Sequence, residues 1–202
     1  MTPGSRVILH NVLREDESPF DLEADARVGL TSVRKSLPSK YFYDSRGSHL
    51  FEMITRLPEY YLTRAETEIL EREAGSVIEA VLPRALVEFG SGAARKTRIL
   101  LDAMRSRGLL EGYGPVDVSL DASRRAADTL IRDYPELLVE GVIGDFEHPH
   151  DLPFAGRPRL LALLGSTIGN LQAEQASGFL LSARAEMTAA DGFLIGFDLV
   201  KD

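Results

Sequence analysis

Three short motifs could hold a nucleoside, and each accompanies an apolar run of the chain. Gly90 and Gly92 follow the first run, and glycine lets the backbone turn tightly and lets a ligand approach closely. Asp117 lies in the second run, where a carboxylate can accept hydrogen bonds from both hydroxyl groups of a ribose. After the third run, the Asp145 carboxylate can accept from an adenine amino group while the Phe146 ring packs on the base.

The glycine turn alone does not identify a ligand. A dinucleotide fingerprint that starts at Gly90 needs a third glycine at position 95, and a phosphate-binding loop needs glycine there before Lys and Thr. Lys96 and Thr97 are present, but Arg95 occupies the glycine position of both patterns. Each motif could also be only structural, as a tight turn or a strand end. Together they favour S-adenosylmethionine, a nucleoside without phosphates, over a nucleotide.

The elements predicted around these motifs are those of an α/β fold. We expect five strands and three intervening helices, the strands at 85–89, 116–120, 138–143, 160–164 and 193–199, the helices at 93–107, between Asp121 and Pro135, and at 173–190. Such alternation implies right-handed crossovers and a mostly parallel sheet. Ligands of open parallel sheets bind at the carboxyl ends of the strands, where all three motifs would lie.

The first part of the chain has a different pattern. Residues 1–20 are polar and punctuated by Pro and Gly, so we expect a flexible arm, whereas 21–83 has a helical pattern. Within it, 63–66 (TRAE) has the form of a capping box, in which the Thr and Glu side chains satisfy free amides at a helix start. The sequence therefore predicts an arm, a helical region and a sheet domain over 84–202.

Composition excludes several other classes of site and partner. The chain has 202 residues, a net charge of −8 and no cysteine, so disulfides and thiolate metal sites are excluded. Its Lys and Arg residues are scattered, so no nucleic-acid partner is expected. No apolar run approaches a membrane span and the start lacks a signal peptide, so we expect no membrane partner and a cytoplasmic protein. His148 and His150 bracket Pro149, which favours a surface loop over a metal site.

Longer motifs carry a resemblance to a known family. They are SLPSKYFYD (36–44), GSHLFE (47–52), ITRLPEYYLTRAE (54–66) and LGSTIGNL (164–171). They resemble the histidine Nα-methyltransferase family of ergothioneine biosynthesis, from about residue 21 to residue 202. The resemblance implies a Rossmann-like class I methyltransferase core that binds S-adenosylmethionine, with the helical region 21–83 contributing to the substrate site.

The resemblance also implies roles for single residues. Positions that contact the cofactor in the family are matched by Tyr43, Gly90, Lys96, Asp117, Asp145 and Phe146. Tyr60 and Asn170 match positions that hold the amino acid's carboxylate and amine, and Thr167 and the Gly165 backbone line the same site. Tyr60 could instead be a core aromatic, and Asn170 a turn residue.

The implied reaction transfers three methyl groups in turn to the α-amine of L-histidine, giving hercynine. It depends on aligning a neutral amine, so we assign no residue as a general base. Family members continue past residue 202 with two more strands, most of the substrate lid and the acidic residue that reads the imidazole. We therefore expect an incomplete domain whose strand 193–199 lies near a sheet edge and favours self-association. Another amine as substrate, or a non-catalytic cofactor-binding or interaction fragment, are the alternatives.

Overall fold

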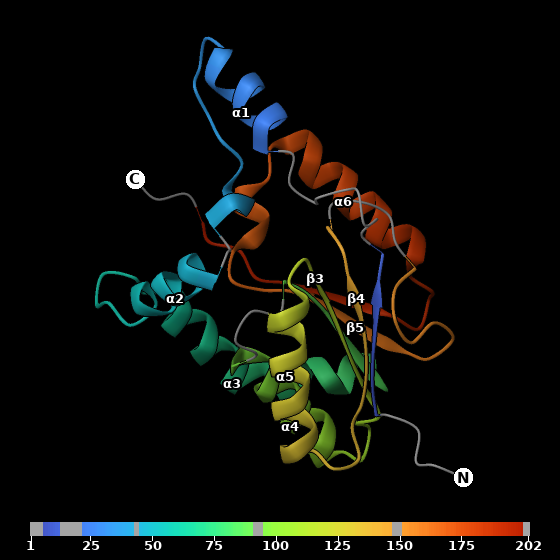
Figure 1. The fold of residues 1–202 in the computed structure, drawn as a ribbon. Coiled ribbons are helices and arrows are strands. Elements are labelled where there is room, and N and C mark those ends of the chain that lie inside the picture. Colours follow the sequence, from blue (N-terminus) through green and yellow to red (C-terminus); the bar gives the residue numbers. More distant parts are fainter. Residues whose placement is uncertain (1–5, 13–21, 43–44, 91–94, 147–150, 200–202) are drawn as a thin grey trace.

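A six-stranded parallel sheet forms the centre of the computed structural model, which describes residues 6–12, 22–42, 45–90, 95–146 and 151–199 (Figure 1). The strands lie in the order β1-β4-β3-β2-β5-β6. Their bounds are β1 (Val7–Asn11), β2 (Ala85–Phe89), β3 (Gly112–Asp117), β4 (Leu138–Ile143), β5 (Arg159–Leu163) and β6 (Gly192–Ile195). Because every neighbouring pair is parallel, the carboxyl ends of all the strands share one edge of the sheet.

Helices cover both faces of the sheet (Figure 1). They are α1 (Leu22–Thr31), α2 (Ser45–Ile54), α3 (Leu62–Val81), α4 (Arg95–Ser106), α5 (Leu120–Asp133) and α6 (Ala173–Glu186), with short 3₁₀ helices η1 (Ser39–Phe42) and η2 (Thr167–Asn170). Side chains of α3, α4 and α5 form one hydrophobic cluster with the sheet, and α6 forms another with the opposite face. Leu86 faces the first cluster and Val87 the second, the alternation of a strand buried on both faces.

The expected flexible arm contains an edge strand, so that prediction is wrong for residues 7–11. β1 pairs in parallel with β4, from Val7 opposite Val139 to Asn11 opposite Ile143. This strand raises the count from the expected five to six. Its residues are half-buried or exposed, and its hydrogen-bond partner lies far along the chain, so local composition gave no sign of it.

The second strand of the domain begins earlier than predicted. We expected it at 116–120, but β3 ends at Asp117. Gly112 and Gly114 disfavour a strand by propensity, yet this strand needs glycine at both positions. A Cβ atom at residue 112 would lie 2.5 Å from the Phe154 ring, and one at residue 114 would lie 2.8 Å from Pro153 Cβ. The segment 151–158 therefore packs directly on the β3 backbone.

Several other boundaries also differ from the predicted ones. α5 begins at Leu120 instead of after Asp121, and its N-cap is Ser119, whose Oγ accepts from Ala122 N at 3.2 Å. α6 ends at Glu186 instead of residue 190, and β6 covers only the first part of the predicted run 193–199. Phe179 and Ala183 of α6 are buried against the sheet.

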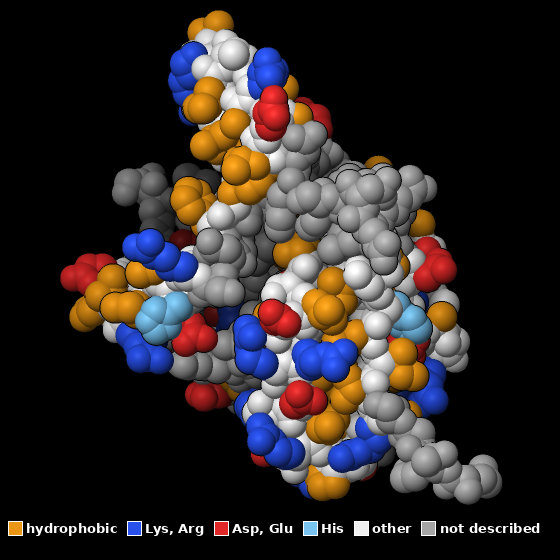
Figure 2. Space-filling model, viewed as in Figure 1, with side chains coloured by type: hydrophobic (Ala, Val, Ile, Leu, Met, Phe, Trp, Pro, Cys, Tyr) orange, Lys and Arg blue, Asp and Glu red, His pale blue; other side chains and the backbone are white. Residues whose placement is uncertain are grey.

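The helical pattern of 21–83 is confirmed, although this region packs unevenly. α3 lies against α4, whereas α1 projects from the body of the molecule (Figure 1). Apolar side chains gather on the visible surface of this projection (Figure 2), and Leu22, Val28 and Leu30 are exposed. Within the described ranges, no helix is long and apolar enough to cross a membrane.

Candidate functional site

The predicted cofactor motifs lie together at the carboxyl edge of the sheet. Gly90 follows β2, Asp117 ends β3, and Asp145 comes shortly after β4. Backbone hydrogen bonds join these strand ends, from Gly90 N to Val116 O at 2.9 Å and from Gly144 N to Asp117 O at 3.0 Å. Three segments that are far apart in sequence thus present their turns side by side.

The glycine turn borders the aromatic ring that was predicted to cover an adenine. Gly90 has φ of +69°, in the left-handed region where glycine is favoured, and a Cβ there would lie 4.0 Å from Phe146 Cε1. The Phe146 ring packs edge-on against Phe179 and Phe89, with centroids 5.6 and 6.3 Å apart. These contacts hold the half-buried ring in place beside the turn.

The two acidic residues of this edge are both half-buried. Asp117 Oδ1 accepts from Ser119 N at 3.0 Å, which fixes the carboxylate above the start of α5. Of the remaining predicted cofactor residues, Tyr43 and Gly92 lie outside the described residues, and Lys96 lies at the start of α4. The structure therefore brings Gly90, Asp117, Asp145 and Phe146 to one edge, and their role in binding stays a prediction.

A buried carboxyl group lies beneath the glycine turn. Glu88 of β2 is 4% exposed and accepts hydrogen bonds from Thr97 Oγ1 at 2.6 Å and Tyr113 OH at 2.8 Å. Burial raises the pKa of Glu88 to about 7, against the two hydrogen bonds and Lys96, which lower it, while Asp117 raises it further. Through Glu88, β2 is tied to α4 and to β3 directly below the predicted ligand site.

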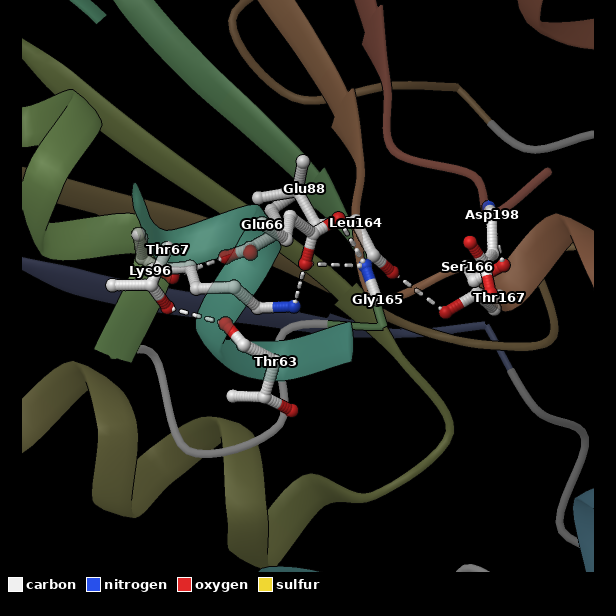
Figure 3. Close-up of polar contacts among 11 residues, drawn as sticks. Thr63, Glu66, Thr67, Glu88, Lys96, Leu164, Gly165, Ser166, Thr167 and Asp198 are labelled. Carbon is white, nitrogen blue, oxygen red and sulfur yellow. Dashed lines mark hydrogen bonds and ion pairs between the residues drawn. The ribbon is translucent and has the colours of Figure 1, made fainter. Parts of the chain in front are cut away.

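The prediction that Glu66 belongs to a capping box is wrong. Glu66 forms an ion pair at the sheet edge instead (Figure 3). The N-cap of α3 is Tyr61, which makes no side-chain cap, and Thr63 lies inside the helix. The Glu66 carboxylate accepts from Gly165 N, at 2.8 and 3.0 Å to its two oxygens, and forms an ion pair with Lys96. The prediction failed because the family-like motif uses this glutamate for a tertiary contact.

The turn after β5 contains three of the predicted substrate residues. Gly165 has φ of +80°, and Thr167 Oγ1 donates to Leu164 O at 2.8 Å. Asn170 is exposed at the end of η2. Ser166 Oγ accepts from Asp198 N at 3.1 Å, so the turn is also held by the segment after β6.

Tyr60, the remaining predicted substrate residue, lies in the turn before α3. Its half-buried ring packs edge-on against Phe51 of α2, with centroids 5.9 Å apart. The next residue, Tyr61, donates its hydroxyl to the Asp198 carboxylate. The helical region thus reaches the turn after β5 through Tyr61 and Asp198 as well as through Glu66.

Sequence reasoning missed the two glutamates that organise this edge. Glu88 left a signal, since it is an acidic residue in an otherwise apolar strand, VEF, next to the glycine turn. Glu66 left a misleading one, because its spacing from Thr63 matched a helix cap.

Comparisons with known proteins agree with this arrangement. A family model described as "Histidine-specific methyltransferase, SAM-dependent" matches residues 22–202. The chain belongs to this family. The histidine N-alpha-methyltransferase of Mycolicibacterium smegmatis is 46% identical over 195 residues, which are 96% of this chain and 60% of that protein. Ergothioneine biosynthesis protein 1 of Schizosaccharomyces pombe is 32% identical over 176 residues, 82% of this chain and 23% of that protein.

Comparison with a solved structure shows the fold class of this chain. The citrinin polyketide synthase CMeT domain superimposes with a TM-score of 0.53 at 18% identity, covering 79% of this chain and 41% of that one. The predicted Rossmann-like class I methyltransferase core is confirmed. The chain spans about three-fifths of the length of the mycobacterial relative.

Proposed function

We propose that this protein is an S-adenosylmethionine-dependent methyltransferase that trimethylates the α-amine of L-histidine to hercynine in ergothioneine biosynthesis. The observation that carries the proposal is the 46% identity to a histidine N-alpha-methyltransferase across 96% of the chain. Membership of a SAM-dependent family supports the cofactor, and the name of the fission-yeast relative supports the pathway. A cytoplasmic location is part of the proposal.

The groups at the sheet edge fit the chemistry of this cofactor. In our proposal the Asp117 carboxylate accepts from the ribose hydroxyls, and Asp145 accepts from the adenine amino group. Phe146 covers the base, while the backbone at Gly90 allows close approach. Tyr43, Gly92 and Lys96 are proposed to complete the contacts. S-adenosylmethionine supplies a methyl group on a sulfonium, which is already strongly electrophilic.

The protein's remaining task is to orient the amine. Tyr60 and Asn170 are proposed to hold the carboxylate and amine of histidine, with Thr167 and the Gly165 backbone lining the same space. Alignment of the reacting atoms can supply roughly 7–11 kcal/mol of a barrier. The α-amine of free histidine is more basic than a peptide N-terminus, whose pKa is about 7.7–8.0, because it lies beside an ionised carboxylate; near neutral pH most of it is protonated. One proton must therefore leave the nitrogen before each attack, and these residues are proposed to orient the lone pair of the neutral amine; we assign no residue as the base.

The test is methylation of histidine by this chain, read by mass spectrometry as one, two and three added methyl groups. A panel of other amino acids is assayed in parallel, and calorimetry measures S-adenosylmethionine binding on the same sample. Hercynine formation supports the proposal. Faster methylation of a different amine would reject histidine as the substrate, and cofactor binding without any turnover would favour the non-catalytic alternative.

A pair of variants tests the proposed division of the site. Tyr60→Phe and Asn170→Ala should leave the affinity for S-adenosylmethionine near that of the parent, while raising the KM for histidine or lowering kcat. If either variant mainly lost cofactor affinity, the residue would belong to the cofactor half of the site.

A further inference from the structure

One carboxylate joins four parts of the fold at the proposed site (Figure 3). Glu66 lies in the second turn of α3, pairs with Lys96 at the start of α4, and accepts from the backbone N–H of Gly165. It also abuts the segment after β6, because a Cβ atom at Gly196 would lie 1.9 Å from Glu66 Oε1. The helical region, the helix after the glycine turn and two strand ends therefore meet at this side chain.

Because Glu66 has little contact with water, its charge must be stabilised by its partners in the protein. Its side chain is only 11% exposed and that of Lys96 only 22% exposed, so each charge depends on the other for much of its stabilisation. Lys96 Nζ is held against the turn after β5, at 3.3 Å from where a Cβ of Gly165 would lie. Without Glu66, the long Lys96 side chain would lose its fixed direction and the Gly165 N–H would lose its acceptor.

We propose that Glu66 is a positioning residue that holds both halves of the site at once, an inference that rests on the proposed function. Through the ion pair it orders the Lys96 cation, which the family resemblance assigns to the cofactor. Through the Gly165 amide it fixes the turn that carries Thr167 and Asn170 on the amino-acid side. Because these groups are already ordered before binding, binding loses less conformational entropy, and its entropic cost is lower.

Two substitutions separate the two contacts, because the contacts need different properties. Lys96 needs a negative charge, whereas the Gly165 N–H needs only a well-placed oxygen. Glu66→Gln keeps the length and one acceptor oxygen but removes the charge. Glu66→Asp keeps the charge but retracts it by one methylene, and the flexible Lys96 side chain can follow it while the backbone of Gly165 cannot. Glu71→Gln, at an exposed position of the same helix, is the matched control.

Glu66→Gln and Glu66→Asp should therefore impair different steps, the first the binding of the cofactor and the second the binding of histidine. Glu66→Gln should weaken S-adenosylmethionine binding about tenfold by calorimetry, the loss expected for one charge-assisted contact. Glu66→Asp should bind the cofactor nearly as the parent does and raise the KM for histidine at little change in kcat. Glu71→Gln should match the parent in both measurements.

A double-mutant cycle distinguishes positioning from a general structural role. If Glu66 acts on the cofactor through Lys96, then Glu66→Gln should have little further effect on cofactor affinity in a Lys96→Met background. Fully additive losses, or unchanged affinity in Glu66→Gln, would overturn the inference while leaving the proposed function intact. A parent chain that binds no S-adenosylmethionine would instead overturn the proposed function, and this inference with it.

Discussion

The buried carboxyl of Glu88 should make the stability of this fold depend on pH near neutrality. Its pKa is raised from an ordinary value of 4.5 to about 7, chiefly by burial. At about 1.4 kcal/mol per unit, this shift corresponds to a cost of about 3 kcal/mol for holding the ionised group in the folded state. The two hydrogen bonds from Thr97 and Tyr113 already oppose this cost and are included in the shifted pKa.

The direction of the effect follows from which state binds the proton. Below about pH 4.5 the carboxyl is protonated in both states, and the folded protein carries no cost. Between about pH 4.5 and 7 the unfolded chain releases the proton first, so the free energy of unfolding falls as pH rises. Above about pH 7 both states are ionised, and the full cost remains.

Glu88→Gln should remove this contribution, because an amide does not ionise. We expect urea unfolding at pH 5 and pH 8 to show a smaller loss of stability with pH in the variant than in the parent, by up to about 3 kcal/mol. The exposed substitution Glu71→Gln should leave the parental pH dependence unchanged. If parent and Glu88→Gln gave parallel profiles, the Glu88 carboxyl would titrate at an ordinary pKa, and burial would not raise it.

Three further predictions concern binding, stability and assembly. Asp117→Ala should weaken S-adenosylmethionine binding by about 1.5–3 kcal/mol in calorimetry, whereas Asp121→Ala on the neighbouring exposed turn should not; equal affinities would reject the ribose assignment. Asp191→Asn should lower the free energy of unfolding by about 3–5 kcal/mol in urea at neutral pH, because the Arg159 side chain, 2% exposed, would lose its ion-pair partner at 3.1 Å. A smaller loss would mean that water or backbone carbonyls replace the Asp191 carboxylate. The chain should self-associate through the edge strand β6, and Phe197→Ser, at a 64% exposed position, should lower the mass seen by light scattering; a monomeric parent would contradict this.

The contribution of Asp191 to stability changes with pH in the opposite direction to that of Glu88. Burial alone raises the pKa of Asp191, but hydrogen bonds from Arg159 and Thr188 outweigh it and lower the pKa below its ordinary value of 3.8. Its contribution to stability is therefore present at neutral pH and lost as pH falls below 3.8 and through the lowered pKa. Acid should thus weaken the contact between β5 and the start of β6 while it relieves the cost at Glu88.

The parallel arrangement of the strands and their shared edge could be predicted because they follow from repeated local patterns. Runs of apolar residues separated by helical segments imply parallel strands, and parallel strands bring Gly90, Asp117 and Asp145 to one edge whatever their separation in sequence. The predicted position of Asp117 at this edge was correct, although the bounds of its strand were wrong. The strand was placed four residues too late at its start, yet the carboxylate still fell on it, and the structure makes it the last residue.

The missed features share a physical cause, which is that their stabilising partners are distant in sequence. β1 is a short and half-exposed strand that exists by pairing with β4. Gly112 and Gly114 belong to a strand because Phe154 and Pro153 pack on them. Propensity describes a residue in the absence of such partners, so it gave the wrong answer wherever tertiary contacts decide the local structure.

Glu66 is the most informative of these cases, because a sound local rule pointed to a different role. A Thr followed three residues later by Glu commonly caps a helix, and the reciprocal contacts would place Glu66 against the backbone of its own first turn. In the structure α3 begins one residue before Thr63, so the amides of its first turn start earlier than the motif requires. The Glu66 side chain instead binds Gly165 N and Lys96, a half-buried amide and a largely buried cation, which both gain from a partner away from water. A residue that forgoes a local hydrogen bond for a tertiary ion pair contributes more to the relative placement of elements than to its own helix, and placement is what alignment of an amine with a methyl group requires.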